Sequence, residues 1–291
     1  MQTIEPLKRK IKSAQDLLSV VKTMKVLAAV SIRQYERATE SLVEYNRTVE
    51  MGLQVVLKQR PEGIRIAEPV PKERLGVIIF GSDQGMVGQF NEVIARHAVS
   101  EINKLQVKQK NRIVLAVGMR VISALEEAGQ PVEEYFSPPG STAAITSAVE
   151  DLALKMEEWR SQQKIDQIVI FYNRERGASY SPHTIHLLPV DPGWFQDLEQ
   201  KPWPSRAIPF FTMDWNRLFS SLIQQYLFVS LYRAFAESLA SENAGRLASM
   251  QAAERNIEDL LEELNSQFQQ QRQSSITEEL LDIVAGFEAL R

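Results

Sequence analysis

The stretch IEPLKRKIKSAQDLLSVV (residues 4–21) places an apolar side chain at every third or fourth position. The same spacing returns between Tyr35 and Val49, and again near the other end of the sequence between Val229 and Phe268. Such alternation is typical of a coiled coil, in which a narrow apolar stripe faces a partner helix. Because the two patterned segments stand at opposite ends of the sequence, the simplest closure pairs them as an antiparallel coiled coil. This arrangement favours transmission of force or position over turnover of a substrate.

The middle of the sequence alternates between two kinds of pattern. Short apolar runs predict strands at 75–80, 112–118, 132–136, 165–173 and 183–190. Amphipathic stretches between them predict helices at 87–105, 119–128 and 141–162. Alternating strands and helices indicate a Rossmann-like α/β domain with a mostly parallel sheet.

Proline-rich segments separate this domain from the two long helices. The stretch PEGIRIAEPVPKE (61–73) follows the first helix, and a second proline-rich bridge precedes Trp215, where Pro209 and Asp214 are candidate start signals for the last helix. We therefore expect an N-terminal coiled-coil helix over 1–60, an α/β domain over 74–191 and a C-terminal coiled-coil helix over 208–291. The last helix outreaches the first. The apolar stretch SITEELLDIVAGFEAL (275–290) therefore either packs on the start of the first helix or needs a socket on another protein.

Composition narrows the class of protein. The chain has 291 residues, 44% of them apolar, and no cysteine, which excludes disulfides and thiolate metal sites. It shows neither a signal-peptide pattern at its start nor an apolar run of the roughly 18–20 residues that a bilayer span requires. A connection to a membrane would have to pass through other subunits.

The charge is distributed unevenly. Seven basic residues against one acidic residue lie between Lys8 and Arg33, whereas six arginines face twelve acidic residues from Thr212 onward. Opposite charge on the two helices favours their pairing, and the basic segment also suits an acidic protein surface. We do not expect nucleic-acid binding, because the basic segment lacks interleaved aromatic residues and the whole chain is acidic.

A search for chemistry finds no catalytic, cofactor-binding or metal-binding residues. The glycine-rich turn FGSDQGMVGQFN (80–91) matches neither GxGxxG nor GxxxxGK[ST], so a structural turn is favoured over a nucleotide site. His183 and His186 are three residues apart in a predicted strand and should point to opposite faces, which disfavours a metal pair. His97 stands alone on a predicted helix.

Several motifs in these segments resemble the gamma subunit of F-type ATP synthase. They are SLASENAGRLASMQAAERN (238–256), RQSSITEELLDIVAG (272–286), VKTMKVLAAVSIR (21–33) and GSDQGMVGQFN (81–91). The resemblance runs through the whole chain in order, and the middle is more divergent than the ends.

The resemblance implies a non-catalytic function in coupling. In that family the coiled coil stands in the axis of a ring of three alpha and three beta subunits. The base rides, with an epsilon subunit, on a ring of membrane c subunits. Ion flow turns the shaft, and the shaft drives the catalytic sites at the alpha–beta interfaces through different affinities. The resemblance also implies a peripheral location on the cytoplasmic face of a cell or thylakoid-type membrane.

Carried over by motif position, the rotor–stator contacts fall on seven residues. They are Met24, Lys25, Arg246, Arg272, Gln273, Thr277 and Glu279. Arginine and lysine there would make charge-assisted hydrogen bonds to stator carboxylates. For Met24, plain packing in the seam is an equally good interpretation.

The chain departs from the family pattern in its base. Gln84 replaces a basic residue, Gly88-Gln89 replaces a double glycine, and Gly118-Met119-Arg120 replaces glycine-arginine-lysine. These changes indicate a divergent member and leave open an alternative, sodium-type F-type ATPase. Two other classes stay open at this point: an enzyme that uses the Rossmann-like insert, and a coiled-coil scaffold or adaptor that does not rotate.

Overall fold

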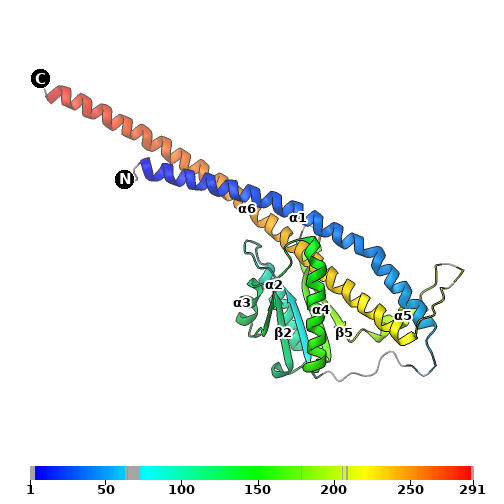
Figure 1. Ribbon diagram of the computed structural model, residues 1–291. Coiled ribbons are helices and arrows are strands. Elements are labelled where there is room, and N and C mark those ends of the chain that lie inside the picture. The colour runs from blue at the N-terminus through cyan, green and yellow to red at the C-terminus, as the bar shows by residue number, and fades with distance from the viewer. Residues whose placement is uncertain are drawn as a thin grey trace. The chain divides into compact units, whose positions relative to one another are not determined.

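The computed structural model describes residues 4–62, 64, 73–177, 179–204, 206–207 and 209–289. The chain divides into two compact units, which we describe separately. The coil unit comprises residues 1–29 and 246–291, and the sheet unit comprises residues 30–245. The helices are α1 (Ile4–Lys58), α2 (Phe90–Lys104), α3 (Arg120–Glu127), α4 (Ile145–Gln162), α5 (Pro192–Gln200) and α6 (Trp215–Ala289), with short 3-10 turns at Gln109–Asn111 and Thr142–Ala144 (Figure 1).

The sheet has five strands in the order β3-β2-β1-β4-β5. They are β1 (Leu75–Phe80), β2 (Arg112–Val117), β3 (Glu134–Phe136), β4 (Gln167–Arg176) and β5 (Ser179–Leu188). The first four strands are parallel, and β5 pairs with β4 in antiparallel fashion. The expected Rossmann-like, mostly parallel sheet is thus confirmed. The β4–β5 hairpin adds an antiparallel edge, which is common on otherwise parallel sheets.

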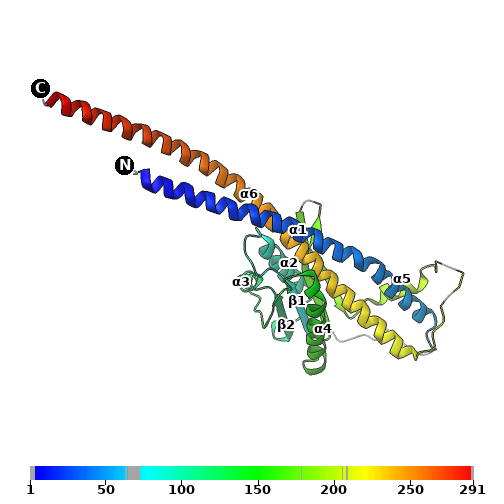
Figure 2. The same ribbon diagram turned by 45° about the horizontal axis from the view of Figure 1, so that its top comes forward.

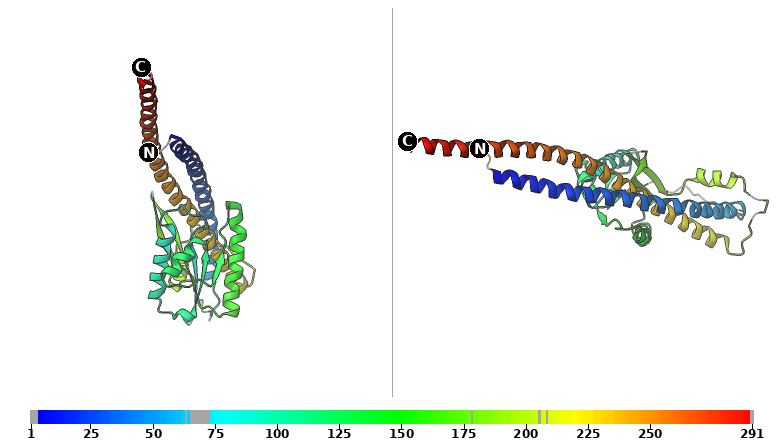
Figure 3. Two further views of the ribbon diagram at one scale, coloured as in Figure 1. Left: turned by 90° about the vertical axis from the view of Figure 1, so that its left-hand side faces the viewer. Right: turned by 90° about the horizontal axis from the view of Figure 1, so that it is seen from above.

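Helices cover both faces of the sheet, and this explains the unbroken apolar runs of its strands. All six residues of β1 are buried, as expected for a parallel strand that is covered on both sides. Alternate residues supply two separate cores: Val77 and Ile79 pack with α2 and α3, whereas Ile78 and Phe80 pack with α4. Figure 3 shows α4 and α2 on opposite sides of the strands.

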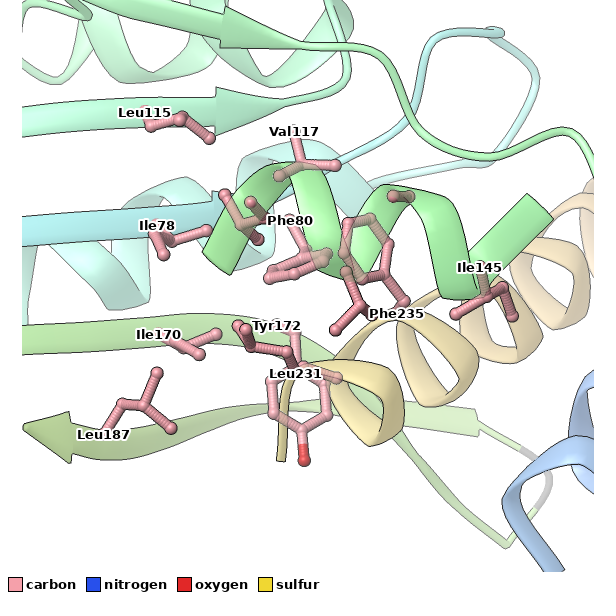
Figure 4. Close-up of a cluster of buried hydrophobic side chains, with 14 of the residues drawn as sticks. Ile78, Phe80, Leu115, Val117, Ile145, Ile170, Tyr172, Leu187, Leu231 and Phe235 are labelled. Carbon is pink, nitrogen blue, oxygen red and sulfur yellow. The ribbon is translucent and has the colours of Figure 1, made fainter. Parts of the chain in front are cut away.

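The first part of α6 packs on the same face of the sheet as α4. Phe235 is fully buried, and its ring meets that of Phe80 edge to face with centroids 4.8 Å apart. Leu231 lies beside it, close to Tyr172 of β4 (Figure 4). The Tyr172 hydroxyl donates a 2.7 Å hydrogen bond to Glu237 Oε2 on α6. Apolar contact and a polar tie therefore join this segment of α6 to the sheet.

Helix α1 begins at Ile4 and ends at Lys58, and helix α6 begins at Trp215 and ends at Ala289. Asp214 caps the start of α6, since its Oδ1 accepts a 3.0 Å hydrogen bond from the Arg217 backbone N–H. Pro209 lies six residues before the helix and is not part of the cap. The three-four spacing between Tyr35 and Val49 predicts Tyr45 in the seam. Tyr45 is exposed instead, and its hydroxyl donates to Gln225 Oε1 of α6 at 2.6 Å.

Helix α5 was not expected, because its segment is rich in proline. Asp191 caps it by accepting a hydrogen bond from the Gly193 backbone N–H at 2.9 Å, and Pro192 occupies the first turn. Proline is well tolerated there, since the first N–H groups of a helix have no partner within the helix. Phe195 and Leu198 of α5 pack with Leu53 and Leu57 of α1.

In the coil unit, the first part of α1 and the segment of α6 from Met250 to Phe268 run side by side in opposite directions, and α6 then extends beyond α1 (Figures 1 and 2). The buried residues of α1 recur every seven positions at Leu7, Ala14 and Val21, and those of α6 recur at Met250, Ile257 and Leu264. Intermediate positions such as Leu18 and Leu261 complete the three-four alternation. The predicted antiparallel coiled coil is therefore confirmed.

Candidate functional site on the coil unit

Ion pairs link α1 and α6 beside the seam of the coiled coil. Lys22 Nζ lies 3.3 Å from Glu258 Oε1 and 3.9 Å from Glu254 Oε1. Lys25 Nζ donates a hydrogen bond to the other carboxylate oxygen of Glu254. This bond to Lys25 is the main reason that the pKa of Glu254 is lowered from its ordinary value. Two lysines on successive turns of α1 thus match two glutamates on successive turns of α6.

Three of the predicted contact residues lie in the paired part of the coil unit. Met24 is half-buried and packs against the seam, as the alternative interpretation expects. Lys25 is half-buried and paired with Glu254. Arg246 is only 7% exposed, so it offers little surface to a partner. The assignment of these residues as contacts stays a prediction.

The other four predicted contact residues lie together on the last turns of α6. Arg272, Gln273, Thr277 and Glu279 are all exposed. Thr277 Oγ1 donates to the backbone oxygen of Gln273 at 2.9 Å, a bond within the helix that leaves the outer surface unchanged. An open groove runs between this segment and Leu7 of α1 and is lined largely by glutamines. The structure therefore brings this group of four together and makes it accessible.

The end of α6 also exposes apolar side chains. Leu281 is 62% exposed and Leu280 is 57% exposed. Ile276, Ile283 and Val284 are about half exposed as well. Figure 3 shows that α6 continues past the start of α1. The described residues of the stretch 275–290 therefore do not pack on the start of the first helix, which was one of the two alternatives. Phe287 and Leu290 fall outside the described side chains.

A second apolar stripe on α1 escaped the sequence analysis. Leu17, Val20 and Leu27 are each more than half exposed, and with Met24 they follow a three-four-three spacing. The signal was available, because this spacing is itself a seam pattern. The stronger stripe through Leu7, Ala14 and Val21 obscures it, since that stripe alone is enough to predict a coiled-coil helix. The coil unit thus exposes apolar surface on both of its helices.

The glycine-rich turn after β1 serves packing. A Cβ on Gly81 would lie 2.4 Å from the Val121 Cβ and 2.8 Å from Asn91 Oδ1. Ser82 is fully buried and accepts a 3.0 Å hydrogen bond at its Oγ from the Asn91 side chain. The turn is therefore locked against the start of α3, and the buried Ser82 hydroxyl is no exposed nucleophile.

The next turn of the sheet fits against this one. Gly118, whose φ of +100° suits glycine, directly follows β2 and donates its N–H to the Phe136 oxygen at 2.9 Å. Asp83 accepts a 2.8 Å hydrogen bond from the Met119 N–H and a 3.0 Å hydrogen bond from the Tyr135 hydroxyl. Asp83, the side chain in this turn most suited to bind a ligand, is thus hydrogen-bonded within the fold. This agrees with a structural turn.

The histidines point where the sequence predicted. His183 stacks edge to face on Tyr172, on the face of the sheet that α4 covers. His97 Nε2 lies 2.9 Å from Thr184 Oγ1 on the opposite face, toward which His186 also alternates. Among the described residues, no three His, Asp or Glu side chains are grouped so as to hold a metal ion. Within the same residues, no helix is long and apolar enough to cross a bilayer.

The fold and this site define a class: a subunit that pairs a long antiparallel coiled coil with a Rossmann-like domain and offers a contact surface on the coil. The family model described as ATP synthase matches residues 3–290. The chain therefore belongs to the ATP synthase family, in which its relatives are gamma chains. It is a non-catalytic rotor subunit of such an enzyme.

Relatives and solved structures agree with this assignment. The chain is 28% identical over 297 residues to the ATP synthase gamma chain of Glaesserella parasuis, with all of both chains covered. It is 25% identical over 291 residues to that of Alkaliphilus metalliredigens, with 99% of both covered. It shares its fold with a chain of the rotor of Euglena gracilis mitochondrial ATP synthase (TM-score 0.61, 16% identity, 94% of this chain and 98% of that chain covered).

Proposed function

We propose that this chain is the rotating central shaft of an F1Fo ATP synthase and couples ion flow across a membrane to ATP synthesis or hydrolysis. Its coil unit would stand inside a ring of three alpha and three beta subunits. Its sheet unit would sit with an epsilon subunit on a ring of c subunits. The chain would then be a peripheral protein on the cytoplasmic face of a cell or thylakoid-type membrane, held there through other subunits.

The observation that carries this proposal is the unpaired apolar end of α6. Leu280, Leu281 and Ile283 are each more than half exposed. A contiguous apolar surface on a soluble helix marks a site of contact with another protein. A socket lined by apolar side chains would hold this end without directional bonds, because hydrophobic attraction has no preferred orientation. The end could therefore turn in the socket at little cost in free energy.

The polar contacts are proposed for the turns next to this apolar end. Arg272 and Gln273 are exposed on α6, and Gln273 lines the groove beside Leu7 of α1. They can make hydrogen bonds to carboxylates of successive beta subunits, and Thr277 and Glu279 lie one to two turns further along. Met24, Lys25 and Arg246 would form a second group of contacts in the paired part of the coil unit. The ion, proton or sodium, would be set by other subunits.

A paired substitution tests the contact assignment. In the assembled enzyme, Arg272→Glu with Gln273→Ala should lower the ATP made per ion translocated while the complex still assembles. The matched control is Arg217→Glu with Asn216→Ala, which likewise reverses one charge and removes one side-chain amide on exposed residues at the start of α6. Equal coupling ratios in the test variant and the control would contradict the assignment.

Stoichiometry tests the wider proposal. A tagged copy of the chain, recovered from its own membranes and weighed by native mass spectrometry, should appear once with three alpha and three beta subunits. Recovery with unrelated partners and without ATPase activity would favour a scaffold that does not rotate.

A further inference from the structure

Glu254 is the least exposed of the four residues Lys22, Lys25, Glu254 and Glu258, which form a charged cluster on the coil unit. Its side chain is 16% exposed, against 32% for Lys25 and about half for Lys22 and Glu258. One carboxylate oxygen faces Lys22 and the other receives the Lys25 hydrogen bond, so the group bridges two ammonium ions. The two lysines and two glutamates balance in charge. The basic segment of α1 is therefore neutralised at the position where the proposed function needs a free positive charge.

An outside carboxylate that approaches Lys25 meets an ammonium group that already has a partner. It is attracted by Lys25 and repelled by the carboxylate of Glu254 beside it. The Lys25 stem can turn, because lysine carries its charge on a flexible chain with three donors. Lys25 can therefore exchange one carboxylate for another or be shared between two.

We propose that Glu254 competes with stator carboxylates for the ammonium group of Lys25, and so limits how firmly the shaft is held at each step. This rests on the proposed function, in which Lys25 faces an acidic segment of a beta subunit. Glu254 is a positioning residue here, since it acts through Lys25. The internal pair keeps the contact weak enough to release as the shaft turns.

The first test examines the pair in the isolated chain. Glu254→Gln keeps the shape of the side chain and removes its charge. It should raise the rate at which an amine-acylating reagent modifies Lys25 by about two- to fivefold, the range that a partly exposed ion pair supports. Peptide mass spectrometry gives the rate for this single lysine. The control, Glu258→Gln, removes the same charge one turn away and should leave Lys25 unchanged. Equal Lys25 rates in the two variants would overturn the proposal.

The second test uses the complex with three alpha and three beta subunits. Glu254→Gln should slow ATP hydrolysis about two- to fivefold, because Lys25 then holds the stator more firmly. The same change made in a Lys25→Gln background should have no effect. Two results would contradict the competition between Glu254 and the stator carboxylates while leaving the contact at Lys25 in place. In the first, Glu254→Gln slows hydrolysis equally in both backgrounds. In the second, Glu254→Gln has no effect although Lys25→Gln changes the rate. If Lys25→Gln itself leaves hydrolysis unchanged, the proposed contact at Lys25 fails, and the competition fails with it.

Discussion

Gly81 at the end of β1 and Val121 at the start of α3 are in such close contact that no larger residue fits between them. A Cβ on Gly81 would lie 2.4 Å from the Val121 Cβ, a separation that real Cβ atoms do not show. The contact locks the β1–α2 turn to the β2–α3 turn, where Arg120 donates its N–H to the Ser82 oxygen at 2.8 Å. The glycine-rich turn after β1, which most resembles a ligand-binding loop, is thus needed for close packing.

Gly81→Ala should therefore destabilise the fold. Overpacking of this kind costs about 1–3 kcal/mol, which chemical unfolding of the chain would measure. Gly85→Ala, in the same turn, is the matched control, because its added Cβ meets nothing nearer than an Arg120 side-chain nitrogen at 3.9 Å. Equal unfolding free energies for the two variants would contradict this account of the turn.

The packing of α6 on the sheet should depend strongly on Phe235. Phe235→Ala leaves a cavity beside Phe80 in a fully buried cluster, and such substitutions cost about 3–5 kcal/mol. Urea unfolding, monitored by circular dichroism, gives the value. A loss below about 1 kcal/mol would mean that α6 is held to the sheet mainly by other contacts.

The exposed end of α6 should behave in the opposite way. Leu280→Ser with Leu281→Ser should change the stability of the isolated chain by less than about 0.5 kcal/mol, since both residues are exposed there. In the assembled enzyme the same pair should reduce ATP synthesis, because the apolar end loses its fit in the socket. Full synthesis by this variant would argue against the socket.

A pair of glutamates should make the stability of the sheet unit depend on pH. Glu175 of β4 and Glu36 of α1 line one cleft, with Arg174 and Glu237. Burial, and then the neighbouring Glu36 carboxylate, raise the pKa of Glu175 above its ordinary value of 4.5. A raised carboxyl pKa stabilises the fold below the ordinary value, and this contribution is lost as the pH rises through the folded-state pKa.

Glu175→Gln should therefore flatten the pH dependence of stability above pH 4.5. The free energy of unfolding of both proteins, measured between pH 4.5 and neutrality, should fall more steeply for the wild-type chain. Parallel curves would show that the proton on Glu175 contributes nothing to the contact between α1 and the β4–β5 hairpin.

The fold was largely predictable, because its signals repeat. Seven-residue spacing from Leu7 to Val49 fixed α1, and continuous apolar runs fixed β1, β2 and β4. Helix α5 could not be predicted, because proline-rich segments form loops in most proteins. Its signal, Asp191 before Pro192, is a local cap that composition obscures.

The candidate site was less predictable, because it depends on which residues meet across the coiled coil. Lys25 was singled out, but its partner Glu254 could not be chosen from a helix that also carries Glu258, Asp259 and Glu262. The register of the two helices decides among them, and spacing within one helix does not determine register. The exposure of Leu280 and Leu281 has the same origin, since it depends on where the two helices stop overlapping.

The central claim is that this chain turns within its complex. The most direct measurement is single-molecule rotation: alpha and beta subunits are fixed to a surface, and a bead is attached to this chain through a cysteine introduced at exposed Lys108, in a sequence that has no other cysteine. With ATP present, we predict continuous rotation in one direction. ATP hydrolysis at a normal rate with a stationary bead would contradict the account.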